Sequence, residues 1–187
     1  MGTETDLARC PWCGTDPLYV DYHDQEWGRP ERAPKRLFEL LILESFQAGL
    51  AWITILRKRE GFRAALQGFD PTIIATWGEP EVTRLLSDSG IVRHRGKIES
   101  TIRSAEAFLR IEAAQGFSPF LWSFVGGAPL QRQPVTMADV PSQTEESQAM
   151  SKALKREGFN FVGPTITYAF MQASGMVNDH LISCHKR

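Results

Sequence analysis

The sequence lacks a long hydrophobic run. No stretch of about 18 apolar residues occurs, so we expect no membrane-spanning helix. The first residues, MGTETDLARC, contain no hydrophobic stretch either, so no secretory signal is expected. These two absences predict a cytoplasmic location.

Cysteine is scarce, and neither sign of charge dominates. In a reducing compartment, three cysteines are better explained by metal binding or simple burial than by disulfide bonds. The formal net charge is −1, so the chain as a whole gives no basic signal. Any contact with nucleic acid must therefore come from local patches, which an enzyme that scans and releases DNA can use without a basic body.

Alternating strand patterns and internal repeats are also absent, whereas apolar residues recur at helical spacing. Over 33–50, one stripe holds Leu37, Leu40, Leu41, Glu44 and Ala48, which predicts a helix with one buried face. Further helices are predicted over 52–60 (stopped by Gly61), 80–87, 94–112, from a cap at Ser142 or Thr144 to Gly158, and from Pro164 to Gly175.

The pattern predicts an all-α fold. Asp70 is expected to cap a further short helix, with Ile73, Ile74 and Trp77 facing inward. The 187 residues are too few for two full-sized domains, so residues 1–187 are expected to form one unit.

Six potential soft metal ligands gather toward the two ends of the chain. The candidates are Cys10, Cys13, His23, His180, Cys184 and His185. A His-x3-Cys spacing places two ligands one helical turn apart, which suits tetrahedral zinc, and a metal would keep short terminal segments from fraying. Six candidates compete for four positions, and isolated buried cysteines with surface histidines explain the pattern equally well. A redox role for Cys-Pro-Trp-Cys is disfavoured because no strand precedes it.

An acidic residue interrupts the apolar stripe at Glu44, where a charge is costly unless it is paired. It either satisfies a hydroxyl or backbone group beside the core, which is the commoner case, or lies at the bottom of a pocket. Aromatic residues gather nearby in the chain: Trp12, Tyr19, Tyr22, Trp27, Phe46 and Trp52. Their default role is to fill a core, but together they would also enclose a flipped base, above all a cationic one.

The segment SGIVRHRGK at residues 89–97 predicts a tight turn between two helices. A turn at Gly90 offers backbone N–H groups to a phosphate, and Arg93, Arg95 and Lys97 add positive charge. The alternative is a solvated basic helix start. Because positive charge at a helix N-terminus is mildly unfavourable, we favour the phosphate ligand.

Five blocks of the sequence resemble the 3-methyladenine DNA glycosylase I family. They are DPLYVDYHDQEWG at 16–28, QAGLAWIT at 47–54, IVRHRGKI at 91–98, FVG at 161–163 and NDH at 178–180. With Cys10 and Cys184, the resemblance covers nearly the whole chain.

The resemblance implies a helix-hairpin-helix glycosylase fold, with the hairpin in 80–112 and a zinc ion joining segments 10–30 and 176–187. The implied zinc ligands are Cys10, His23, His180 and Cys184, which leaves Cys13 and His185 outside. Four protein ligands leave no open position, so the zinc is expected to be structural. The implied base pocket is formed by Trp12, Tyr19, Tyr22, Trp27, Glu44 and Trp52.

By the same resemblance, Glu44 is the residue on which catalysis depends, through hydrogen bonds to the edge of the excised base. Gly49 and Leu50 are expected to fill the position that the base vacates in DNA, alongside contacts from Gly90, Arg93, Arg95 and Lys97. Phe46 stands where a polar residue is expected, which puts the detail of the DNA contacts on that side in doubt.

The implied activity is hydrolysis of the N-glycosidic bond of 3-methyladenine in alkylated double-stranded DNA by a monomer, with free 3-methyladenine as product. Lys97, at a helix start expected to face phosphate, is a poor candidate for a Schiff-base nucleophile, so a monofunctional enzyme is expected. The alternatives are a noncatalytic, zinc-stapled DNA-binding module and a catalytic zinc hydrolase of a small substrate.

Overall fold

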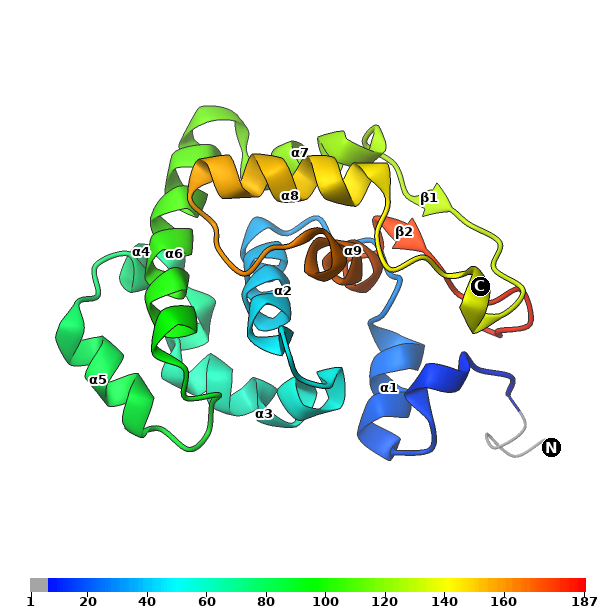
Figure 1. Ribbon diagram of the computed structural model, residues 1–187, viewed down its shortest axis with the longest axis horizontal. Coiled ribbons are helices and arrows are strands. Elements are labelled where there is room, and N and C mark those ends of the chain that lie inside the picture. Colours follow the sequence, from blue (N-terminus) through cyan, green and yellow to red (C-terminus); the bar gives the residue numbers. More distant parts are fainter. Residues whose placement is uncertain (1–6) are drawn as a thin grey trace.

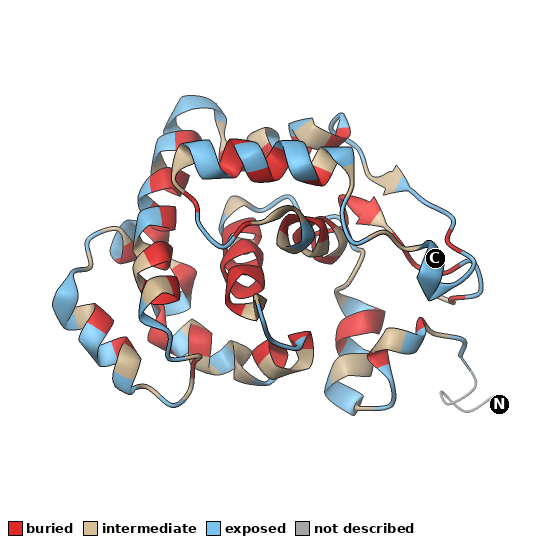
Figure 2. Cartoon of the chain, in the orientation of Figure 1, coloured by how far each residue is buried: buried red, intermediate tan, exposed pale blue. Residues whose placement is uncertain are grey.

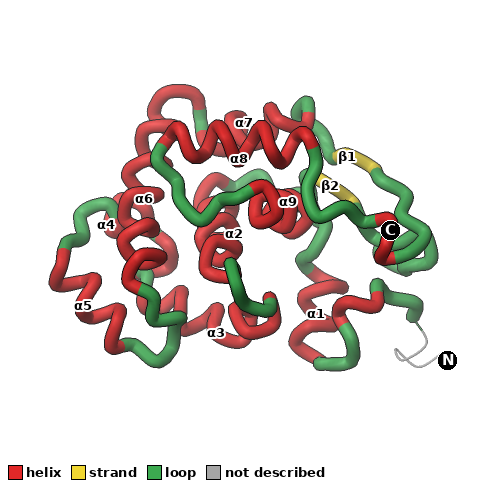
Figure 3. Tube along the Cα trace, viewed as in Figure 1, coloured by secondary structure: helices red, strands yellow, loops and turns green. Residues whose placement is uncertain are grey.

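The computed structural model describes residues 7–187. The expectation about a secretory signal, and the first residues of the expected single unit, concern residues 1–6, which lie outside this range. Helices dominate the described part of the chain (Figure 3). None of its helices combines the length and apolarity that a membrane crossing requires.

Helix α2 (Pro34–Gln47) runs through the middle of the molecule, and residues 37–46 are all buried (Figures 1 and 2). Helix α9 (Pro164–Ala173) packs against it, and α8 (Glu145–Glu157) packs across α9. The other α-helices are α1 (Pro17–Gln25), α3 (Trp52–Ala65), α4 (Pro71–Ile74), α5 (Glu79–Ser87), α6 (Arg95–Gln115) and α7 (Phe117–Trp122). Short 3-10 turns are η2 (Pro11–Cys13), η3 (Gln67–Phe69), η4 (Ser123–Val125) and η5 (Met137–Asp139).

Side-chain caps fix where several helices begin. Asp16 accepts hydrogen bonds from the backbone of Leu18 and Tyr19 at the start of α1, with Pro17 at the first helical position. Asp70 caps α4 and Thr144 caps α8, both as expected. These caps set the direction of the chain where it enters each helix.

Three expectations about local structure are wrong. Helix α3 does not stop at Gly61 but continues to Ala65; position 61 is a glycine because a Cβ there would collide with the backbone of Gly90, and the residue does not mark a helix end. Ile73 is 42% exposed, since α4 has a single turn and buries only its other face. The expected absence of strands is wrong at one place: β1 (Leu130–Gln131) pairs in parallel with β2 (Val177–Asn178), too short a pairing to show an alternating pattern.

The two ends of the described chain meet on one side of the molecule. The backbone N–H of His185 donates to the carbonyl of Ala8 at 2.9 Å, and β2 carries the chain from α9 toward the N-terminal segment. The first helix and the last residues therefore form one structural region beside α2 and α9 (Figure 1).

Candidate active site and metal centre

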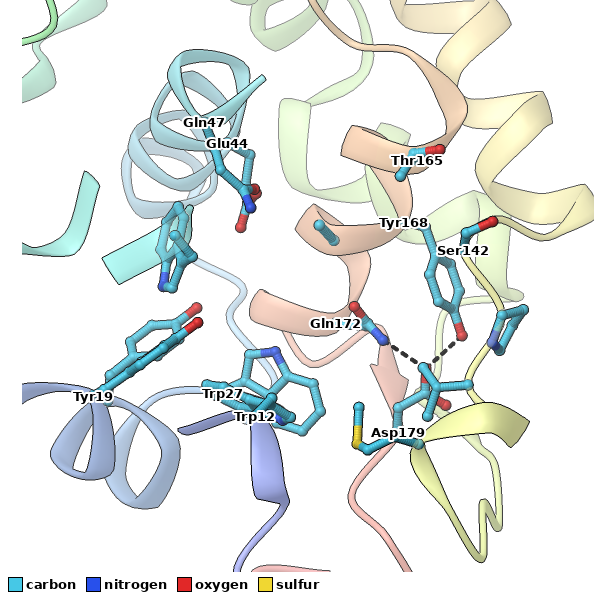
Figure 4. Close-up of a pocket in the computed structure, with 16 residues that line it drawn as sticks. Trp12, Tyr19, Trp27, Glu44, Gln47, Ser142, Thr165, Tyr168, Gln172 and Asp179 are labelled. Atoms are coloured by element: carbon cyan, nitrogen blue, oxygen red, sulfur yellow. Dashed lines mark hydrogen bonds between the residues drawn. The ribbon is translucent and has the colours of Figure 1, made fainter. Parts of the chain in front are cut away.

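A pocket of about 270 Å³ opens between the N-terminal segment, α2 and α9 (Figure 4). Its walls are formed by Trp12, Tyr19, Tyr22, Trp27, Glu44, Gln47, Trp52, Met137, Val140, Pro141, Ser142, Thr165, Tyr168, Ala169, Gln172 and Asp179. All six residues expected to form a base pocket are in this set, although they come from four separate segments. Their convergence was expected, whereas the role of each residue stays a prediction.

The aromatic residues contact one another, Trp12 edge to face with Tyr19 and Trp27, and Tyr22 at a tilt to Trp52. The ring centroids of Trp12 lie 5.0 Å from Tyr19 and 4.9 Å from Trp27, and Tyr22 lies 5.5 Å from Trp52. Such contacts fix ring orientation better than apolar packing alone. The result is an aromatic chamber suited to a planar ring.

Glu44 lies on α2 with its carboxylate at this pocket, only 3% exposed. It forms no hydrogen bond or ion pair with any residue of 7–187, and its Oε2 atom is buried without a partner. Burial alone raises the pKa of Glu44 from 4.5 to about 8. The common alternative, a glutamate that satisfies a neighbouring polar group of the core, is therefore not what the structure shows.

Polar atoms that lack a partner are concentrated at the pocket. Within residues 7–187, the buried side-chain nitrogens and oxygens without a hydrogen bond belong to Trp12, Glu44, Gln47, Trp52 and Asp179, all of which line it. Buried polar groups are nearly always paired in folded proteins, so such a cluster marks a place where a ligand supplies the partners. The two indole N–H groups are donors, and the other three atoms are acceptors.

The wall formed by α9 and β2 was missed by the sequence reasoning. Asp179 is 2% exposed, and its Oδ2 accepts hydrogen bonds from the Tyr168 hydroxyl at 2.5 Å and the Gln172 amide at 2.8 Å. Its Oδ1 lies 3.6 Å from Nε of Arg132. Asp179 belongs to the NDH block and Tyr168 and Gln172 share one face of α9, but that helix reads as apolar on most sides and conceals the pair.

Four buried side chains from the two ends form a cluster suited to a metal. One ligand atom each of Cys10, His23, His180 and Cys184 lies within 4.8 Å of all the others. The Sγ of Cys184 lies 3.5 Å from Nε2 of His23 and 3.4 Å from Nδ1 of His180. Tetrahedral zinc with its usual bond lengths separates sulfur and nitrogen ligands by about 3.5 Å, so the donor set fits this ion.

Outer contacts prepare the two histidines for metal binding. Nδ1 of His23 lies 2.7 Å from a carboxylate oxygen of Asp24, and Nε2 of His180 lies 3.2 Å from the Trp27 carbonyl. Both oxygens are acceptors, so these nitrogens carry the protons and the opposite, unprotonated nitrogens face the cluster. Cys13, whose thiol donates to the Cys10 carbonyl, and His185, which contacts Ala8, lie outside the set as expected.

The expected phosphate-facing position of Lys97 is wrong. Lys97 is 6% exposed, and its ammonium donates to the carbonyls of Phe46 at 2.9 Å and Ala48 at 2.7 Å. The charge of this lysine is evident from the sequence, but the direction of its side chain is not. The carbonyls at the end of α2 have no partner within the helix, and the ammonium group turns inward to bind them. In the same region, Phe46 stands where a polar residue was expected. Its ring is fully buried against Phe62, which explains why an apolar side chain suits this position.

The other residues expected to contact DNA lie at the surface or close to it. Arg95 pairs with Glu79 and Glu99, Arg93 is exposed, and Gly90 lies in the turn between α5 and α6. Gly49 has a φ of +85°, which favours glycine, and Leu50 beside it is 42% exposed. Their contacts with DNA remain predictions.

Comparison with known proteins places the chain in a family. The sequence pattern of the methyladenine glycosylase family matches residues 12–187. The DNA-3-methyladenine glycosylase 1 of Escherichia coli (strain K12) is 51% identical over 179 residues, which are 95% of this chain and 96% of that protein.

Solved structures of similar proteins support the same family assignment. A crystal structure of 3-methyladenine DNA glycosylase I superimposes with a TM-score of 0.94 at 51% identity, covering 95% of this chain and 98% of the other. A Tyr-to-Phe variant of 3-methyladenine DNA glycosylase I, solved in complex with 3-methyladenine, superimposes with a TM-score of 0.92 at 38% identity, covering 95% and 96% of the two chains.

Proposed function

Because the chain belongs to the methyladenine glycosylase family, we propose that it is a base-excision repair enzyme that hydrolyses the N-glycosidic bond of 3-methyladenine in alkylated double-stranded DNA. The observation that carries the proposal is the buried, unpartnered carboxyl group of Glu44 within an aromatic pocket. A base enters such a pocket only when its nucleotide is turned out of the helix.

The charge of the damaged base complements the pocket. Adenine alkylated at N3 is cationic in DNA, and aromatic faces attract a cation. The cation also favours the ionised form of Glu44, whose pKa burial alone raises to about 8. Glu44 therefore ionises as the base enters and accepts hydrogen bonds from its edge.

The chemistry requires little acid catalysis. As the C1′–N9 bond breaks, its electron pair passes to the base, which leaves neutral as free 3-methyladenine. The oxygen of a water molecule bonds to C1′, and the proton that it loses passes to solvent. The contribution of this chain is to hold and select the base and to exclude bulk water from it.

A monofunctional enzyme is the consistent reading. A lyase needs a lysine amine that attacks the sugar. No lysine belongs to the set of residues that lines the pocket, and the ammonium of Lys97 is bound to two carbonyl groups.

We further propose that Cys10, His23, His180 and Cys184 bind a structural zinc ion, which would join segments 10–30 and 176–187. Zinc would supply no reaction chemistry here, because four protein ligands leave it no open position. The helix-hairpin-helix region is proposed in 80–112, which holds most of α5 and α6 and the turn between them, and the protein is expected to act as a monomer on DNA.

The decisive experiment measures release of free 3-methyladenine from methylated DNA. The purified protein is expected to release it, and Glu44→Gln is expected to lower the rate about 10- to 100-fold, the usual effect of losing a charge-assisted hydrogen bond. Glu106→Gln, an exposed position on α6, is the matched control and should leave the rate unchanged.

Three outcomes would contradict parts of this proposal. DNA binding without any release of base supports the noncatalytic DNA-binding module. A bound zinc ion with three protein ligands and a water supports the zinc hydrolase. Full activity in a folded Glu44→Gln protein would remove Glu44 from base recognition.

A further inference from the structure

The α9 wall of the pocket holds a glutamine whose orientation is fixed by its neighbours. The Nε2 atom of Gln172 donates to Oδ2 of Asp179 at 2.8 Å, and the same oxygen accepts the Tyr168 hydroxyl at 2.5 Å. Because a carboxylate oxygen accepts hydrogen bonds, the amide must turn its nitrogen toward Asp179. Its oxygen therefore faces the other way.

That other direction is the cavity. Figure 4 shows the amide oxygen of Gln172 directed into the pocket, on the wall across from Glu44. No residue of 7–187 donates a hydrogen bond to this oxygen. Gln172 thus presents a fixed acceptor to whatever occupies the pocket.

The fixed orientation of the Gln172 amide allows it to discriminate between ligands. A free glutamine presents either its donor or its acceptor by turning the amide over, and so distinguishes little. Asp179 removes that freedom: it is buried, is held by Tyr168, and has Arg132 beside its second oxygen. An amide with one permitted orientation rejects a ligand that places an acceptor opposite it, because two acceptors then face each other without a proton.

We propose that Gln172, oriented by Asp179 and Tyr168, is a specificity-determining residue whose Oε1 accepts a hydrogen bond from the exocyclic amine of the excised base. Adenine carries an amino group at position 6, where guanine carries a carbonyl oxygen. Gln172 therefore favours 3-methyladenine over 3-methylguanine. Glu44 responds both to the base edge and to the positive charge that the two alkylated bases share, whereas the neutral amide of Gln172 responds to the edge alone.

This inference rests on the proposed glycosylase function, and the test separates the two. Methylated DNA supplies both bases, and the kcat/KM for release of each is measured. Gln172→Met keeps the length of the side chain and removes the acceptor. It is expected to lower 3-methyladenine release about 10- to 100-fold and to keep or raise 3-methylguanine release, because the variant no longer places an acceptor opposite the guanine carbonyl. Gln115→Met, at the exposed end of α6, is the matched control.

Tyr168→Phe provides a second variant. It removes one hydrogen bond to Asp179 while keeping the ring, so the amide of Gln172 is expected to be held less firmly. The ratio of 3-methyladenine release to 3-methylguanine release should therefore fall, but by a smaller factor than in Gln172→Met. This ratio distinguishes a positioning role from a structural one, because simple loss of folded protein lowers both rates equally.

The outcomes are distinct. No base release by the parent protein defeats the proposed function itself. An active parent protein whose preference is unchanged in Gln172→Met, or a variant that loses both activities equally, overturns the assignment of Gln172 alone. If Gln172→Met does not fold, an unchanged ratio in Tyr168→Phe overturns it as well.

Discussion

At the scale of single residues, Glu44 trades stability for function. The residue occupies a helical position that suits a leucine, and its carboxyl group has no partner among the described residues. Burial therefore holds it in the neutral form until a cation arrives. Unpaired polar groups at one pocket are the cost of keeping that pocket ready for a ligand.

The burial of Glu44 predicts that the difference in stability between Glu44→Gln and the parent protein depends on pH. The pKa of Glu44 is about 8 in the folded protein against an ordinary value of 4.5. The stability due to the neutral carboxyl is thus fully present below about pH 4.5 and is lost as the pH rises through 8. Glu44→Gln has no proton to lose, so its advantage over the parent protein should grow from pH 5 to pH 8, toward several kcal/mol at about 1.4 kcal/mol per pKa unit.

Thermal unfolding of both proteins at each pH measures this difference. The metal cluster is common to the two proteins, so its own pH dependence cancels. The Glu106→Gln control should follow the parent protein throughout. A gap in Tm that stays constant between pH 5 and pH 8 contradicts a neutral Glu44.

At the scale of elements, Lys97 ties the start of α6 to the end of α2. Its ammonium satisfies two carbonyls just before the Gly49–Leu50 turn, where the last residues of a helix otherwise lack partners. The position of Leu50 at the surface thus depends on a residue 47 positions away in the sequence, and a lysine expected to touch DNA instead shapes the turn beside it.

Lys97→Met keeps the apolar stem and removes the ammonium. Leaving the two buried carbonyls without a donor is expected to cost about 1–3 kcal/mol of unfolding free energy, as measured by urea denaturation. We also expect weaker binding to DNA with an abasic site, while affinity for free 3-methyladenine changes little. Lys35→Met, at an exposed lysine paired with Asp70, is the control; an equal loss in that variant contradicts the role of Lys97.

The helices and the aromatic half of the pocket could be predicted because they depend on local pattern: helical spacing, caps such as Asp70, and ordered motifs. The other half of the pocket could not. Gln172 and Asp179 meet only through the turn after α9, and nothing in the sequence states which way an amide points. Gly61 failed as a helix stop for the same reason, since the backbone of Gly90 that lies against it is distant in sequence.

At the scale of the whole molecule, the metal cluster and the pocket share neighbours. Trp27 lines the pocket, and its carbonyl accepts from His180; Trp12 follows Cys10 and lies 5.3 Å from the His23 ring. The aromatic chamber is therefore built on the proposed zinc site.

Loss of the metal should accordingly disturb base binding. Cys184→Ala is expected to lose zinc and lower the Tm substantially, and its remaining folded fraction should bind free 3-methyladenine more weakly. Cys13→Ala, which removes an equally buried thiol outside the cluster, should keep one zinc per chain. Metal content, Tm and tryptophan fluorescence measure these effects, and a normal melting profile without bound metal contradicts the zinc proposal.

The contact between Cys10 and His180 spans 170 positions of the chain. Such a contact closes a very long loop, and that entropy is lost before the contact stabilises the chain, so contacts of this kind form late in folding. Helices α2 and α3, which also pack together, are by contrast adjacent in the chain. We therefore expect the pocket to acquire its N-terminal wall last, so that a chain can already be largely folded and still be unable to hold a base.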